Sequence, residues 1–273
     1  MGRNIPKEWA QAYRKIFWEV NHREPNSESG EVLDRRTAFA LHVLSKAGVI
    51  EKGRSLVDLG SGMSWLGPIA SQLGLDVTLI DDFGGGGGLD LQVYRSQSLG
   101  LANIYREKFE IDIVEQDLIA NPLPFSDNTI DIITCSHVLE HWHHSPKRLF
   151  GEIHRSLRAG GYFLLVTPNA VNLRKRIWVL FGKTNYCDLS GWYDPEVFRG
   201  HVREPVLADL RQLVQWNDFN VVKSYGRNFI GAYSHKLPWL GPSTIRRLVE
   251  IGDNVVKFFP TLCSDIHVLA QKK

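Results

Sequence analysis

A short apolar run that contains an acid and is followed by two glycines is the first feature of this chain that points to a ligand site. The run 55–59 contains Asp58, and Gly60 and Gly62 follow it directly. Glycine tolerates positive φ and has no Cβ, so a turn from a strand into a helix can bring its backbone against a ligand there. Asp81 ends the next apolar run about 20 residues downstream, the spacing expected for a carboxylate that binds a ribose. These residues predict a site for a nucleotide or nucleoside.

The third glycine position of such turns distinguishes between ligands. A dinucleotide site needs the spacing G-x-G-x-x-G, in which the third glycine lets helix and strand pack closely beside a pyrophosphate. Trp65 stands at that position, and an indole fits poorly there. The pattern is instead D-x-G-x-G-x-S, with Ser64 in place of a further glycine. It argues against an oxidoreductase that uses a dinucleotide.

Four segments follow the glycine turn, and their order is more specific than any one of them alone. The second of these segments reads LPFSDNTIDIITCSHVLEH, and the third reads RAGGYFLLVTPN. Together with the glycine turn they resemble the class I S-adenosylmethionine-dependent methyltransferases, in particular the branch found in ubiquinone and glycan biosynthesis. Alanine stands at position 159, where that branch usually has proline. The resemblance covers roughly residues 53 to 225, and its four later segments are 111–118, 123–141, 158–169 and 201–214.

The resemblance implies that S-adenosylmethionine is the cofactor and assigns residues to it. Asp81 would bind the ribose hydroxyls, with the neighbouring Asp82 as the alternative. Asp117 would accept a hydrogen bond from the adenine amino group, and the backbone N–H of Leu118 would meet the ring. The glycine turn would let the backbone contact the methionine part. The full implied set is Asp58, Gly60, Ser61, Gly62, Asp81, Asp82, Asp117, Leu118, Ser136 and His137.

Methyl transfer to a hydroxyl or an ammonium needs a base as well as a positioned acceptor. The candidates follow the fourth predicted strand, and ligands of parallel sheets bind at the carboxyl ends of the strands. We expect His137 first and His141 second, with Glu140 beside them. Glu140 and His141 could instead brace the following helix, and for His141 this structural role is slightly favoured. His143 and His144 are expected in a solvated loop.

A metal ion has to be weighed at the same place. Some relatives use the spacing E-x-x-E-H to bind a divalent ion. Here His137 replaces the first acid, and histidine suits Mg²⁺ poorly because this ion prefers oxygen ligands. We therefore expect no functional metal.

Apolar runs that alternate with helical patterns predict an α/β fold with a doubly wound, mostly parallel sheet buried on both faces. The resemblance implies the Rossmann-like methyltransferase fold, in which the seventh strand is antiparallel and lies between the fifth and the sixth. The predicted strands are 55–59, 76–80, 111–115, 130–135, 161–167, 220–225 and 266–270.

The expected organisation is an N-terminal helical extension, residues 1–50, ahead of a methyltransferase domain, residues 51–273. Insertions at about 170–204 and 229–263 are rich in aromatic and basic residues and would build the substrate side. The five consecutive glycines from Gly84 to Gly88 are expected to form a mobile surface loop.

Composition excludes several classes of protein. The 273 residues are 43% hydrophobic and 23% charged, as expected of a soluble globular protein. The net charge of +2 gives no general argument for a nucleic-acid partner, and the N/D-P-P-Y/F motif of many nucleic-acid methyltransferases is missing after the fourth strand. Three scattered cysteines, no N-terminal apolar signal and no apolar run of about 20 residues lead us to expect a cytoplasmic protein.

The segment 172–183 mixes basic and apolar residues at helical spacing. A lid helix with a solvated basic face is the favoured interpretation, and contact with an anionic membrane surface stays open. The expected reaction is methyl transfer to a small-molecule or glycan- or lipid-precursor acceptor, on oxygen. The alternatives are methylation of nitrogen and a non-catalytic binding protein with the same fold. The sequence does not indicate the oligomeric state.

Overall fold

The computed structural model describes residues 8–9, 11–12, 14–16, 35–62, 64–84, 91–183, 186–228, 252 and 255–273. Most of the N-terminal helix expected before residue 21, four of the five consecutive glycines (Gly85 to Gly88), and residues 229–250 of the second insertion lie outside these ranges.

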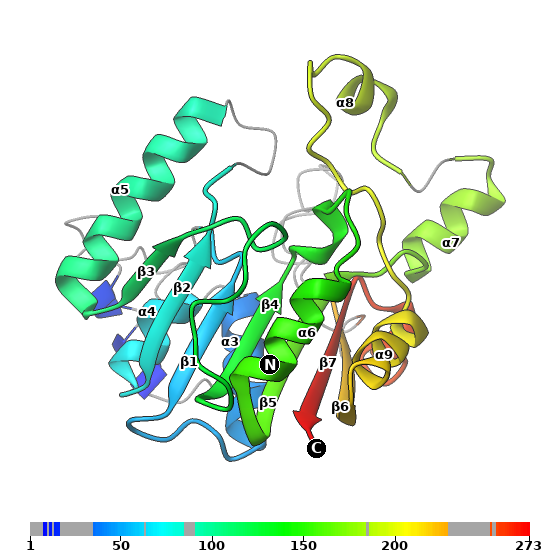
Figure 1. Cartoon of the computed structure of the whole chain (residues 1–273). Helices are drawn as coiled ribbons and strands as arrows, with labels where there is room; N and C mark the ends of the chain where they lie inside the picture. The colour runs from blue at the N-terminus through cyan, green and yellow to red at the C-terminus, as the bar shows by residue number, and fades with distance from the viewer. Residues whose placement is uncertain are drawn as a thin grey trace.

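Within the described residues, seven strands form one sheet in the order β3-β2-β1-β4-β5-β7-β6 (Figure 1). Strand β7 pairs antiparallel with both β5 and β6, and the other neighbours pair in parallel. The expected fold class and the place of the seventh strand are therefore confirmed. The strands are β1 (Ser55–Leu59), β2 (Asp76–Asp81), β3 (Asp112–Glu115), β4 (Ile130–Ser136), β5 (Leu157–Pro168), β6 (Phe219–Arg227) and β7 (Asp265–Lys272).

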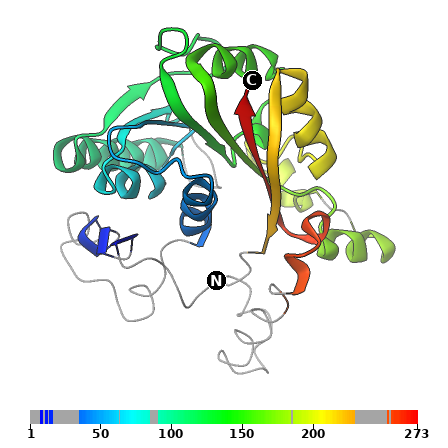
Figure 2. The same ribbon diagram turned by 90° about the horizontal axis from the view of Figure 1, so that it is seen from below.

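Helices cover both faces of this sheet (Figures 1 and 2), which explains why the central strands are almost continuously apolar. Successive residues of β1 point to opposite faces of the sheet. Leu56 packs in one core, against the helices on one face, and Val57 packs in a second core, against the helices on the other. The first core joins the sheet to α3 (Arg35–Lys46), α4 (Leu66–Gln72) and α5 (Leu91–Phe109), and the second joins it to α6 (Lys147–Ser156) and α9 (Leu207–Trp216).

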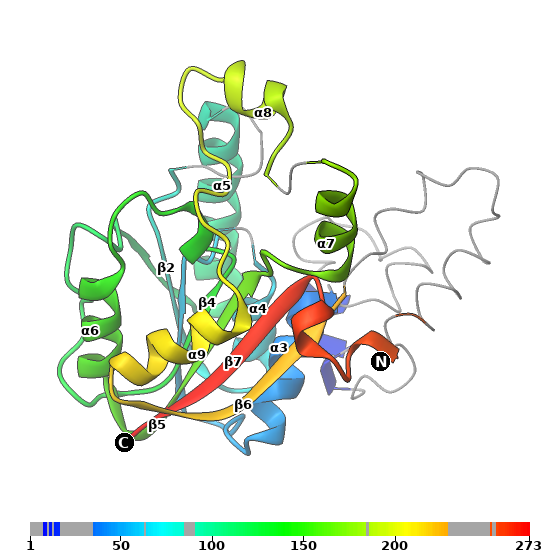
Figure 3. The same cartoon turned by 90° about the vertical axis from the view of Figure 1, so that its right-hand side faces the viewer.

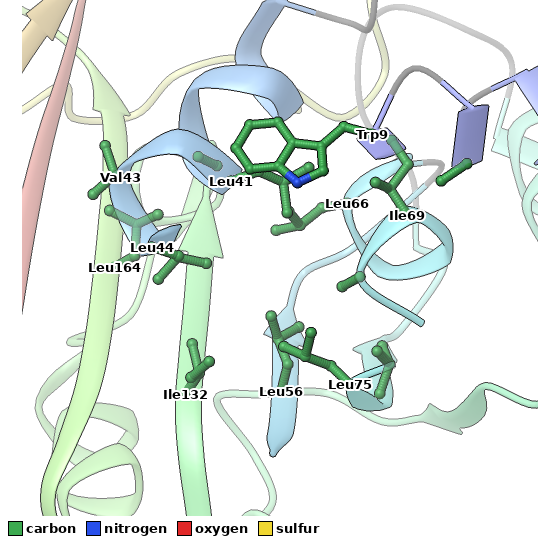
Figure 4. Close-up of a cluster of buried hydrophobic side chains, with 14 of the residues drawn as sticks. Trp9, Leu41, Val43, Leu44, Leu56, Leu66, Ile69, Leu75, Ile132 and Leu164 are labelled. Carbon is green, nitrogen blue, oxygen red and sulfur yellow. The ribbon is translucent and has the colours of Figure 1, made fainter. Parts of the chain in front are cut away.

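The described N-terminal residues belong to the first of these cores. Trp9 and Ile16 are buried in it together with side chains of α3 and α4, and Figure 4 shows the Trp9 indole beside Leu41 and Leu66. Helix α3 lies inside the span that the helical pattern predicts and is followed by Gly48 at φ +71°. The division of the chain at residue 50 stays a prediction.

Strand β5 begins four residues earlier than expected. Leu157 already pairs with Ile130, and the register then shifts before Ile132 pairs with Tyr162. Gly160, at φ +73°, lies in the irregular stretch between these pairs. The residues Arg-Ala-Gly-Gly, most of which precede the predicted strand 161–167, therefore form an irregularity within β5.

The first insertion forms two short helices, α7 (Leu173–Leu180) and α8 (Leu189–Tyr193). Figures 1 and 3 show both helices beyond the edge at which the parallel strands end, clear of the layers that cover the sheet. The second insertion is described only near its end, where the 3₁₀ turn η3 (Pro260–Leu262) leads into β7. No helix among the described residues is long and apolar enough to span a bilayer.

At the edge of the sheet where the parallel strands begin, the carboxylate of Asp131 links its own strand, β4, to β1 and β5. It accepts hydrogen bonds from the backbone N–H and the hydroxyl of Ser55, each at 2.9 Å, and pairs with Arg158 at the start of β5. Only 10% of the Asp131 side chain is exposed, so its loss would leave the Ser55 donors unpaired in a largely buried place.

Asp131→Ala should therefore lower the free energy of unfolding by about 2–3 kcal/mol, measured by urea denaturation. Asp127→Ala is the matched control. Asp127 also pairs with an arginine, Arg155, but 69% of its side chain is exposed, so this change should cost about 0.5 kcal/mol or less. Equal losses in the two variants would contradict the structural role of Asp131.

Candidate functional site

The glycine turn after β1 has a backbone that only glycine adopts easily. Gly60 and Gly62 have φ values of +65° and +50°, and the Gly60 N–H donates to the carbonyl of Ile80 at 2.8 Å. A Cβ built on Gly60 would lie 2.3 Å from Cγ2 of Val138. The turn therefore packs directly against the segment that leaves β4, and the sharp turn itself is the one that the spacing of the glycines predicts.

Asp81 fixes this turn to the end of β2. Its Oδ2 accepts a hydrogen bond from the Gly62 N–H at 2.8 Å, and its Oδ1 accepts one from the Phe83 N–H at 2.6 Å. Burial raises the pKa of Asp81, and the two backbone hydrogen bonds oppose this effect. The neighbouring Asp82 is exposed and accepts a hydrogen bond from Gly84 N–H at 2.7 Å. The two adjacent acids thus differ, because only Asp81 contacts the glycine turn.

Asp58 is a second carboxylate at this edge, and it is buried, whereas Asp81 is only partly buried. Thr134 on β4 donates its hydroxyl hydrogen to Asp58 Oδ1 at 2.6 Å. Burial raises the pKa of Asp58 to about 7, and the nearby negative charge of Asp81 acts in the same direction. Ser61 is also buried, and its hydroxyl makes no hydrogen bond to the described residues. A cation bound here would offset the unfavourable burial of the two carboxylates.

The remaining expected cofactor residues follow the neighbouring strands. Asp117, just after β3, is exposed and accepts hydrogen bonds from the N–H groups of Ile119 and Ala120 at 2.7 and 3.0 Å. Leu118 is buried beside it, and Ser136 ends β4. Parallel strands end at one edge of the sheet, so all the expected donor-site residues lie along that edge.

His137 lies between two carboxylates that come from distant parts of the chain. Its Nδ1 is 3.5 Å from Glu140 Oε1, and its Nε2 is 3.5 Å from Asp265 Oδ2. Burial alone would lower the pKa of His137, but the two carboxylates outweigh it and raise the pKa to about 9. At neutral pH the ring is therefore an imidazolium. His137 also has φ +59°, an uncommon backbone conformation for a bulky residue.

The sequence analysis missed Asp265, which begins β7 and also pairs with Arg36 of α3 at 3.2 Å. Asp265 could have been found from the sequence, because this acid directly precedes a strand that is expected to be antiparallel. The start of an antiparallel strand lies at the same edge as the ends of the parallel strands.

Glu140 is fully buried beyond His137, and within the described residues neither of its carboxylate oxygens makes a hydrogen bond. Its backbone carbonyl accepts hydrogen bonds from the N–H groups of Val202 and Arg203, at 2.7 and 3.2 Å. These contacts bring His201 close, with Nε2 3.9 Å from Glu140 Oε1. The first insertion is thus joined to the end of β4 through Glu140.

The opposite side of His201 meets an acid that sequence analysis did not single out. His201 Nδ1 lies 2.7 Å from Glu204 Oε1, and Glu204 also pairs with the buried Lys175 of α7. Burial lowers the pKa of Lys175 to about 8. His141 lies against His201 with ring centroids 4.9 Å apart, and its Nδ1 is 3.2 Å from the carbonyl of Arg199.

Comparison with known proteins identifies the family to which the chain belongs. A family model described as a methyltransferase domain matches residues 30–224, which is more than half of the chain. The chain belongs to this methyltransferase family. S-adenosylmethionine is its cofactor. A search of the curated proteins finds no match.

Solved structures with the same fold include several methyltransferases. A putative sarcosine dimethylglycine methyltransferase of Galdieria sulphuraria matches with TM-score 0.54 and 13% identity, over 97% of this chain and 98% of that one. An S-adenosylmethionine-dependent methyltransferase of Mesorhizobium loti matches with TM-score 0.54 and 17% identity, over 85% and 96%. Phosphoethanolamine N-methyltransferase 2 of Haemonchus contortus, in complex with S-adenosylmethionine, matches with TM-score 0.53 and 17% identity, over 96% and 56%. At these identities the likeness concerns the fold.

The residues at the glycine turn of this methyltransferase fit its cofactor. Positive φ at Gly60 and Gly62 allows the sharp turn after β1, and the carboxyl groups of the buried Asp58 and the partly buried Asp81 lie beside it. S-adenosylmethionine carries a sulfonium and an ammonium, the charges that such carboxylates favour.

One group of side chains in the described part of the methyltransferase has the geometry of a metal site. The ligand atoms of Glu140, His141 and His201 all lie within 4.8 Å of one another. However, the His137 imidazolium already supplies a positive charge beside Glu140. The expectation that no metal is needed therefore stays a prediction.

We predict that the purified methyltransferase contains no stoichiometric metal by elemental analysis. Dialysis against EDTA should leave its thermal unfolding midpoint and its cofactor affinity unchanged, because Glu140 has its counter-charge without an ion. A midpoint that falls after EDTA treatment and recovers with Zn²⁺ or Mn²⁺ would contradict this.

Asp58 generates a prediction about stability and pH. Its pKa is about 7 in the folded chain and has its ordinary value, near 3.8, when unfolded. Between these values the folded state binds a proton that the unfolded state has lost, so stability decreases as pH rises. Asp58→Asn keeps an acceptor for Thr134 and removes the titration. The midpoint of the variant relative to the wild type should therefore rise between about pH 4 and about pH 7 in calorimetry. Parallel profiles would show that Asp58 does not titrate in this range.

Proposed function

We propose that this methyltransferase transfers a methyl group to a hydroxyl oxygen of a small molecule or of a glycan or lipid precursor. The observation that carries the proposed base is the contact between His141 and the carbonyl of Arg199. A carbonyl oxygen only accepts, so Nδ1 of His141 carries the hydrogen and a neutral ring keeps its lone pair on Nε2. Such a ring can accept the proton of a hydroxyl.

The three residues proposed for catalysis then have different roles. His137, the first expectation from the sequence, is held as an imidazolium and cannot accept a proton in that state. These contacts favour His141 as the base, with His137 and Glu140 as the groups that position it and the acceptor. The choice of oxygen over nitrogen rests on resemblance to one branch of the family. When bound, S-adenosylmethionine supplies a methyl group that its sulfonium has already activated.

In the proposed donor site, Asp81 binds the ribose hydroxyls and holds the glycine turn, whereas Asp117 binds the adenine amino group. Asp81→Ala should weaken the binding of S-adenosylmethionine about tenfold or more in calorimetric titration, because it removes the contact with the ribose and the hydrogen bond to the glycine turn. Asp82→Ala is the control and should bind as the wild type does. If Asp82→Ala loses affinity and Asp81→Ala does not, the ribose partner is misassigned. Absence of binding by the wild type would favour a non-catalytic relative.

The base can be tested by measuring the release of S-adenosylhomocysteine with a panel of small hydroxyl compounds and their amine counterparts. On a hydroxyl acceptor, His141→Gln should lower the turnover rate about 100-fold, the usual contribution of a general base, without changing cofactor affinity. His143→Gln, an exposed neighbour, should turn over normally. Turnover on amines alone would instead favour nitrogen methylation.

A further inference from the structure

Helix α7 buries a charged side chain and exposes apolar ones, which is the reverse of the usual arrangement of a helix on a globular protein. Such a helix buries an apolar stripe and exposes its charged residues. In α7 the residue that is buried is Lys175, whose side chain pairs with Glu204, whereas Leu180 is 83% exposed. The next helix, α8, has no buried residue. Both helices thus present apolar side chains outward.

The exposed apolar side chains are concentrated in this one part of the described chain. We call those of α7, together with Phe181 directly after it, the apolar edge. Its members are Leu173, Ile177, Trp178, Val179, Leu180 and Phe181. Exposed patches of this kind mark interaction surfaces, since scattered single residues would need no explanation.

The apolar edge extends toward the segment before β7. Arg176 of α7 donates to the carbonyl of Thr261 at 3.4 Å, and Phe258 and Phe259, just before it, are 75% and 57% exposed. Figures 1 and 3 show α7 and α8 projecting beyond the ends of the parallel strands. The apolar edge is therefore on the same side of the molecule as the candidate site.

The charges of α7 and of the residues directly after it have one sign, whereas α8 is flanked by Asp188 and Asp194. The segment 173–183 contains four basic residues and no acid, and its one buried cation is Lys175. Arg174 places its guanidinium 4.6 Å from the centre of the Trp178 ring, and Lys183 is exposed at the end of the helix. Tryptophan and long basic side chains together suit the boundary between headgroups and acyl chains, with the cations at the lipid phosphates.

We propose that the apolar edge docks on a membrane surface that contains anionic lipids. Apolar area alone would also suit another protein. The cations of α7, with no acid among them, favour the negative surface potential of anionic lipids. Helix α7 has eight residues, too few to cross a bilayer and enough to lie in its interface. The proposal does not depend on the identity of the methyl acceptor.

The test is sedimentation of the full chain with vesicles of phosphatidylcholine alone and of phosphatidylcholine mixed with phosphatidylglycerol, at low and high salt. We expect binding to the mixed vesicles that weakens with salt. Leu180→Glu with Phe181→Glu should lower the partition coefficient about tenfold or more, equivalent to ~1.4 kcal/mol. Arg174→Glu with Lys183→Glu should abolish the preference for phosphatidylglycerol.

The matched controls are Trp216→Glu and Arg211→Glu, because both residues are exposed on α9, away from the apolar edge. They should bind vesicles as the wild type does. All variants should keep the thermal midpoint of the wild type, since the altered side chains are exposed. Absence of vesicle binding, equal binding to both vesicle types, or equal losses in the controls would overturn the proposal. A dimer that the Leu180 and Phe181 changes dissociate would also overturn it, because the occupant would be a second copy.

Discussion

The positive charge on His137 holds together the edge of the sheet at which the candidate site lies. Burying Glu140 and Asp265 would be strongly unfavourable without a cation between them. The imidazolium supplies it, and Asp265 shares a second cation, Arg36. The charge of His137 thus joins the end of β4, the turn that contains Glu140 and the start of β7, and Arg36 adds α3 through Asp265. The uncommon φ of His137 is tolerated because these contacts fix the ring.

The acids of the glycine turn show the complementary situation. Asp58 is buried and Asp81 is partly buried near it, and hydrogen bonds compensate only part of the cost, so the pKa of each is raised. The turn is thereby less stable than its packing alone would make it. A cationic ligand is the natural way to recover that stability, so a site shaped for S-adenosylmethionine costs folding free energy until it is filled.

The features that the sequence predicts correctly are those encoded locally. Strand positions follow apolar runs, and the glycine turn follows from positive φ at Gly60 and Gly62. Asp265 and Lys175 were missed because their partners are far away in the sequence: Asp265 meets His137 across more than a hundred residues, and Lys175 meets Glu204 across 29. A local pattern cannot indicate which carboxylate will face a given imidazole. The early start of β5 was missed for a related reason, since Gly160 favours a turn locally and the pairing with β4 overrides it.

The place of β7 between β5 and β6 has a consequence for how the chain folds. Its residues pair with β5 across about a hundred positions, as with Pro168 and Asp265, so this contact closes a long loop and should form late. Until then β5 has an unpaired hydrogen-bonding edge in the middle of the future sheet, and His137 lacks one of its two carboxylates. The species before insertion would be the one most exposed to edge-to-edge aggregation. The strand that completes the candidate site is therefore also the one whose insertion protects the chain from self-association during folding.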